Sequence, residues 1–145
     1  MRENYRDRAV VIRTYDFREA DRVIVLLTRD HGLVRAVAKG VRRAKSRFGS
    51  RLQLFVNLDV QLYVGKNLAT ISQADTVDYF GARLIEDYER YTAACAVLES
   101  AERLAFADAD HDPYLYESVT ATLEQLQTAD PVSYTHLTLP TILLV

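Results

Sequence analysis

The chain of 145 residues carries 18 lysines and arginines against 20 aspartates and glutamates, and 49% of its residues are hydrophobic. This length and apolar share suit one ordinary packed domain, or one small domain with part of another, and exclude a disordered chain. We expect neither a membrane span, which takes about 20 apolar residues, nor a signal peptide. The single cysteine, Cys95, excludes an internal disulfide and a cysteine-based zinc site, and favours a cytoplasmic protein.

The charge is distributed unevenly along the chain. Residues 1–57 contain 14 basic and 6 acidic residues, a balance of +8, whereas residues 58–145 contain 4 basic and 14 acidic residues, a balance of −10. The net charge of −2 therefore hides a strongly dipolar molecule. Such asymmetry indicates a basic nucleic-acid-binding part joined to an acidic body.

The first half of the chain predicts a small β-barrel. Alternating or β-branched segments predict strands, and Asp30-His31-Gly32 and Gly65-Lys66-Asn67 mark turns between them. The predicted strands cover residues 8–15, 22–28, 33–38, 52–64 and 68–77. Five short strands with little helix between them favour an oligonucleotide-binding (OB) barrel over residues 1–79, with an SH3-like barrel as the rival.

The pattern changes to helical spacing after residue 80. One apolar stripe predicts a helix over about residues 79–106, and Asp112-Pro113 starts a second helix. The stripe consists of Leu84, Tyr88, Tyr91, Cys95 and Leu98. We interpret residues 80–131 as a partial α-helical domain whose apolar face stays partly exposed, and residues 132–145 as a non-native or disordered tail. The fold class is therefore α+β.

The residues from His31 to Leu58 include no acid and form the predicted binding segment. A one-signed charge patch on a small β-domain is typical of a protein that binds a polyanion. The predicted phosphate contacts are Arg35, Lys39, Arg42, Arg43, Lys45, Arg47 and Arg51. Phe48 and Phe55 are the candidates for base stacking, and Phe55 is the better one because it falls opposite the apolar stripe of its strand. No element for groove recognition is apparent, so we expect binding independent of sequence.

Other chemistry finds little support in the sequence. No phosphate-binding loop or nucleophile elbow is present, and we expect no catalytic residue, no cofactor and no metal. Two alternatives stay open: an RNA-binding barrel of translation, and a Mg²⁺-dependent nuclease that uses Asp16, Glu19 and Asp21.

Several segments resemble the start of the bacterial DNA repair family RecO. They include Arg13 to Asp21, His31-Gly32-Leu33, and the run from Val37 to Arg47 with its Ala-Lys-Gly-x-Arg-Arg-x-Lys-Ser core. The resemblance covers about residues 8–130 and implies an N-terminal OB barrel followed by helices, here truncated. It also implies binding and annealing of single- and double-stranded DNA during DNA damage repair and recombination, at the nucleoid. The implied partners are RecR, with which the family loads the recombinase RecA, and single-strand-binding protein.

Overall fold

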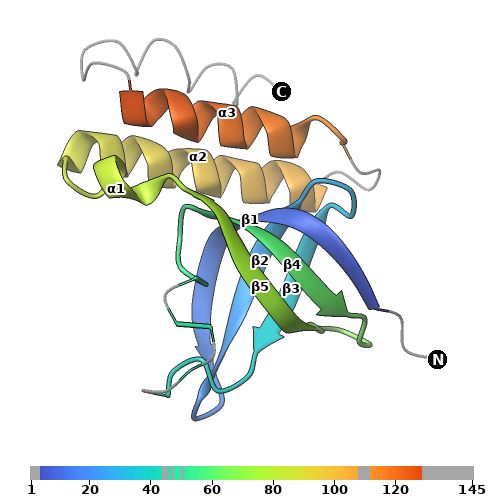
Figure 1. Ribbon diagram of the computed structural model, residues 1–145. Coiled ribbons are helices and arrows are strands. Elements are labelled where there is room, and N and C mark those ends of the chain that lie inside the picture. The colour runs from blue at the N-terminus through green and yellow to red at the C-terminus, as the bar shows by residue number, and fades with distance from the viewer. Residues whose placement is uncertain (1–3, 44–45, 47, 50, 108–111, 129–145) are drawn as a thin grey trace.

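The computed structural model describes residues 4–43, 46, 48–49, 51–107 and 112–128. Five strands close into a barrel in the order β1-β2-β3-β5-β4 (Figure 1). They are β1 (Asn4–Phe17), β2 (Asp21–Thr28), β3 (Leu33–Ala38), β4 (Val56–Tyr63) and β5 (Ala69–Tyr79). The long β1 pairs with both β2 and β4, and β3 runs parallel to β5. This Greek-key order is that of an OB-type barrel, so the predicted α+β fold is confirmed and the SH3-like rival is set aside.

The barrel interior is filled by the alternating apolar residues of its strands. Val11, Ile24 and Leu26 meet the stripe Leu58, Val60 and Leu62 of β4 there, and all six are fully buried. The strand predicted over residues 52–64 is shorter than expected and begins at Val56. The reason is Phe55, whose φ of 70° lies in the left-handed region and ends the extended backbone.

A β-bulge in β1 decides which side chains face outward. The pairing of β1 with β2 shifts between Val11 and Arg13, so that Ile12 is an extra residue. Strict alternation from Val11, which faces the interior, would turn Arg13 inward as well. After the bulge, Ile12 is buried beneath the helices and Arg13 is exposed. The bulge therefore supplies both an apolar contact and a surface cation from neighbouring residues.

In the described part of the chain, three helices follow the barrel: α1 (Gly81–Leu84), α2 (Tyr88–Ala107) and α3 (Leu115–Thr128). The single helix predicted over residues 79–106 is wrong, because the chain breaks after Leu84 and Asp87 starts a new helix. The Asp87 carboxylate accepts a hydrogen bond of 3.0 Å from the Glu89 amide. The break changes the helical phase, so Tyr88 of the predicted stripe is 81% exposed.

The helices pack against the barrel and against each other. α2 and α3 lie side by side across one end of the barrel (Figure 1). Val97, Leu98 and Ala101 of α2 pack in one core with Val119 and Leu123 of α3. The barrel residues in this core are Val10, Ile12, Val25, Leu27 and Phe55. Of the predicted stripe, Leu84 and Leu98 are buried in this core, whereas Tyr88 and Tyr91 are 81% and 39% exposed. Among the described residues, the predicted apolar face is therefore covered only in part.

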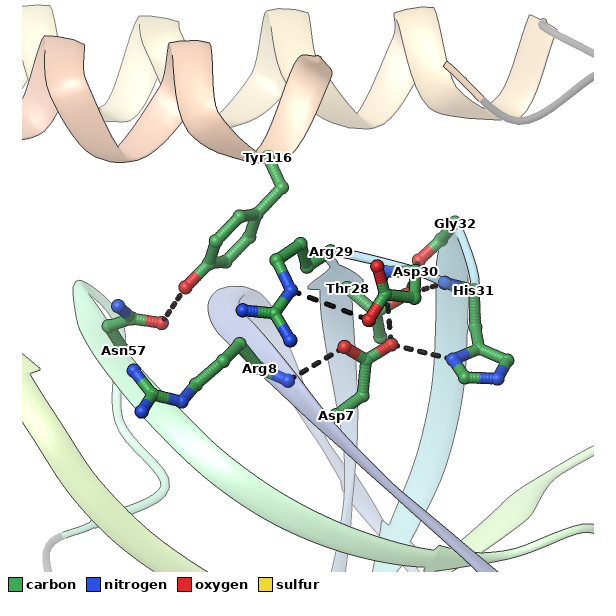
Figure 2. Close-up of polar contacts among 9 residues, drawn as sticks. All are labelled: Asp7, Arg8, Thr28, Arg29, Asp30, His31, Gly32, Asn57 and Tyr116. Carbon is green, nitrogen blue, oxygen red and sulfur yellow. Dashed lines mark hydrogen bonds and ion pairs between the residues drawn. The ribbon is translucent and has the colours of Figure 1, made fainter. Parts of the chain in front are cut away.

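Arg90 and Tyr116 fasten this helical layer. Arg90 is buried in α2, and its guanidinium donates hydrogen bonds to the carbonyl oxygens of Leu126 and Gln127, at the end of α3. A cation there satisfies free carbonyls and complements the helix dipole. On the barrel side, the Tyr116 hydroxyl of α3 donates a 2.7 Å hydrogen bond to the buried Oδ1 of Asn57 in β4 (Figure 2).

Replacing Tyr116 with phenylalanine is expected to lower the free energy of unfolding by about 1–3 kcal/mol, because Asn57 loses its buried donor. Burial raises the pKa of Tyr116 above its usual 10.0, because the ionised phenolate would lose its hydration there. A raised pKa in the folded state means that the unfolded chain ionises first as the pH rises. The stability from Tyr116 is therefore complete below about pH 10 and is lost above it.

Urea unfolding at about pH 8 and again above about pH 10 tests this prediction. The difference in stability between the wild type and Tyr116→Phe should shrink at the higher pH. Tyr114→Phe is the matched control, because Tyr114 is 71% exposed and should change little at either pH. If Tyr116→Phe lost the same free energy of unfolding at both pH values, the raised pKa of Tyr116 would be contradicted.

Candidate nucleic-acid interface

The predicted phosphate contacts that the structure describes are all exposed. Arg35 lies on the outer face of β3, Lys39 follows the end of that strand, and Arg42 and Arg43 lie in the next turn. Arg51 is also exposed, but it lines a separate hollow beside β5 with Phe48 and Ser72. Lys45 and Arg47 lie outside the described residues.

The start of the basic segment is fixed against the turn between β1 and β2. Gly40, with a φ of 70°, donates its amide to Oδ1 of Asp21 at 2.8 Å. Two residues later, the Arg42 amide donates to the carbonyl oxygen of Ala20 at 3.0 Å. Gly40 tolerates this left-handed backbone at little cost, which explains a glycine at that position. These two hydrogen bonds hold the β1–β2 loop beside the segment after β3. We call the exposed cations Arg35, Lys39, Arg42 and Arg43 the basic surface.

Asp16 organises the arginines of this surface. Its carboxylate lies 3.1 Å from Nε of Arg22 and 3.5 Å from a terminal nitrogen of Arg42. Asp16, Glu19 and Asp21 are the magnesium ligands of the nuclease alternative, but Asp16 faces arginines and Asp21 holds the Gly40 amide. Among the described residues, no three acidic, histidine or cysteine side chains gather in a way that could hold a metal ion.

The structure adds Arg13 and Tyr15 of β1 to the basic surface. Tyr15 is 38% exposed, and the Arg13 guanidinium lies 5.3 Å from the centre of its ring. Arg13 is in register with Val25 of β2, which is in register with Arg35 of β3. The two arginines therefore lie in one row across the sheet. Arg13 is not among the predicted contacts, because the bulge at Ile12, which turns its side chain outward, leaves no signal in the hydrophobic pattern.

Phe48 and Phe55 do not offer a ring face to a base. Each is only 2% exposed. Phe48 packs in the barrel core, and Phe55 packs in the core beneath the helices. The rings of Phe55 and Tyr91 meet edge to face, with their centres 6.0 Å apart. The expected exposure of Phe55 is wrong, because residue 55 does not belong to the strand whose alternation predicted it. A stacking role for either ring would require the core to open.

A polar cluster around the buried Asp7 side chain fixes the turn from which β3 starts (Figure 2). The Asp7 side chain is fully buried and accepts hydrogen bonds from the amides of Arg8 and Asp30, at 2.7 and 3.1 Å. Nδ1 of His31 lies 2.6 Å from the same carboxylate. Thr28 completes the turn by donating its hydroxyl to the Gly32 carbonyl at 2.7 Å. This cluster holds the β2–β3 hairpin against β1 and so sets the position of Arg35.

Comparison with known families agrees with this architecture. Residues 1–80, more than half of the chain, match the family RecO_N, described as Recombination protein O N terminal. No helix within the described ranges has both the length and the apolar character needed to cross a membrane. The matched region contains the whole barrel and every residue of the basic surface. The chain belongs to the RecO family, its first 80 residues are the family's N-terminal part, and its role lies in DNA recombination and repair.

Proposed function

We propose that this protein is a non-enzymatic mediator that binds single-stranded DNA along the basic surface of its barrel. The observation that carries the proposal is a series of exposed cations, which runs from Arg13 and Arg35 in one row of the sheet to Lys39, Arg42 and Arg43 beside the β1–β2 loop. In OB barrels, the β2–β3 face and the adjoining loops are the usual place for an oligonucleotide. The exposed Tyr15 adds a ring on which a base can stack.

The finer role follows the family. Binding two complementary strands on exposed cations would lower their mutual repulsion and so favour annealing. We propose duplex DNA as a second ligand, RecR as the partner in loading the recombinase RecA, and strands coated with single-strand-binding protein as the substrate. Such a role on chromosomal DNA implies action at the nucleoid in the cytoplasm. Arg35, Lys39 and Arg43 form no ion pair with any residue in the described part of the chain, so they are available to phosphates.

Salt dependence of DNA binding tests the electrostatic part. With about five to seven phosphate contacts, the slope of log K against log salt for a single strand should be roughly −3 to −5. The double variant Arg42→Ala/Arg43→Ala should flatten the slope by about 1 to 2 and weaken all sequences alike. Anisotropy titrations of a labelled oligonucleotide over a range of salt concentrations give both values.

The matched control removes two arginines elsewhere. Arg6, paired with Asp59 on the β1–β4 side, and Arg83 on α1 are both exposed. Arg6→Ala/Arg83→Ala changes the net charge equally and should leave the slope nearly intact. If both double variants flattened the slope equally, binding would depend on the net charge of the protein and not on the positions of Arg42 and Arg43. Tighter binding of RNA than of DNA would favour the RNA-binding alternative, and strand cleavage with Mg²⁺ would favour the nuclease.

A further inference from the structure

An exposed aromatic ring from the helical layer stands beside the basic face of the barrel. Phe106, near the end of α2, is 74% exposed. It lines two adjoining hollows, one of about 420 Å³ with Arg35 and Asn67, and one of about 440 Å³ with Arg13 and Glu102. Because Phe106 borders both hollows, it lies between the two arginines.

The sheet beneath explains this placement. Arg13, Val25 and Arg35 form one row across β1, β2 and β3, and Val25 is fully buried under the helices. The arginines are two strand spacings apart, about 10 Å. The end of α2 therefore covers the centre of the row and leaves a cation on each side.

We propose that Phe106, Arg13 and Arg35 form a stacking site for one unpaired base of single-stranded DNA. The proposal rests on the proposed function and adds a residue from the acidic half of the chain. Aromatic faces stack any base, and flanking arginines bind the phosphates on either side. Asn67 lies in the loop between β4 and β5, a loop that OB barrels use for oligonucleotides, and its amide can bond a base edge.

Three acidic residues line the two hollows: Asp112 lines the first, and Glu99 and Glu102 line the second. Two of them, Glu102 and Asp112, are already engaged. Glu102 lies 3.2 Å from a terminal nitrogen of Arg13, and Asp112 accepts a 2.8 Å hydrogen bond from the Tyr114 amide at the start of α3. A phosphate would compete with Glu102 for Arg13. Glu102→Gln is therefore expected to tighten binding of single strands by about two- to threefold at low salt, as the loss of an exposed ion pair allows.

The decisive experiment compares a strand with bases and one without. Labelled oligothymidylate of about 16 nucleotides, within the site size of one OB fold, is titrated beside an abasic strand of equal length and beside a duplex. Wild type should prefer the strand with bases. Phe106→Ala should weaken binding of that strand about tenfold, to the level of the abasic strand, and leave duplex binding unchanged. Phe106→Tyr should retain the preference, whereas Phe106→Leu, which keeps apolar bulk, should lose it.

Tyr88→Ala is the control, because Tyr88 is a more exposed aromatic at the other end of α2. If wild type binds no strand in a salt-dependent way, the proposed function itself fails. If wild type binds and Arg42→Ala/Arg43→Ala weakens binding, but Phe106→Ala equals wild type, only the stacking site is overturned. Equal weakening of the base-containing and abasic strands by Phe106→Ala would also overturn it, and would point to a surface for a protein partner instead.

Discussion

Phe55→Ala is expected to lower the free energy of unfolding by about 3–5 kcal/mol, the usual cost of truncating a buried phenylalanine. The ring lies where the barrel and the helices share a core, edge-on to Tyr91. The backbone of residue 55 also bonds both sides of that junction: its amide donates to the Val11 carbonyl at 3.4 Å, and its carbonyl accepts from the Phe80 amide at 2.9 Å. The substitution therefore leaves a cavity at a point that joins two layers.

Urea unfolding followed by circular dichroism measures this loss. The matched control is Phe106→Ala, since Phe106 is exposed and its removal should change stability by less than about 0.5 kcal/mol. The two phenylalanines should separate cleanly: Phe55→Ala weakens folding and spares the DNA affinity of the folded protein, and Phe106→Ala does the reverse. A stable Phe55→Ala protein that had lost affinity for single strands would restore Phe55 as a stacking residue.

Asp7→Ala is expected to cost about 3 kcal/mol of stability, because hydrogen bonds to a charged acceptor are stronger than neutral ones and their buried donors would be left without a partner. The amides of Arg8 and Asp30 and the ring of His31 all depend on this carboxylate. Asp7→Asn, which keeps one oxygen as an acceptor, should lie between the alanine variant and the wild type.

Thermal and urea unfolding of both variants give these values, and Asp30→Ala is the control. The Asp30 carboxylate is 57% exposed and its contact with Arg29, at 3.4 Å, is a surface ion pair of small worth. A loss below about 1 kcal/mol for Asp7→Ala would mean that water replaces the carboxylate in the turn.

Much of the barrel could be predicted from the sequence because the signal for strands is local. The alternation of Leu58, Val60 and Leu62, and the turn at Gly32, follow from the two-residue period and from the freedom of glycine. Counting strands could not decide how they pair. The choice of the OB order came from the resemblance, because pairing β1 with β4 depends on contacts between residues far apart in the chain.

The errors arise where one residue resets a periodic pattern. The left-handed Phe55 ends an alternation that otherwise extends back to Leu52, and the bulge at Ile12 turns Arg13 outward. In the helical part, the Asp87 cap breaks a stripe that reads as continuous. The candidate site is predictable only in part: local charge density points to Arg35, Arg42 and Arg43, whereas tertiary packing alone brings Phe106 beside Arg13 and Arg35.

The strand pairs of the barrel differ in the number of residues that they join, and the barrel is weakest between β3 and β5. β3 and β5 pair only through Ala36 with Ala69 and Val37 with Thr70, whereas β2 pairs with β3 along the whole of β3. Local opening costs least where the fewest hydrogen bonds break, so amide protons should exchange with solvent earliest along this seam. Breathing at the seam would alter the spacing between Arg35 and the β4–β5 loop. The β1–β2 side, clamped beneath α2, would keep its shape, so the protein could adapt to a strand's path without loosening its helical layer.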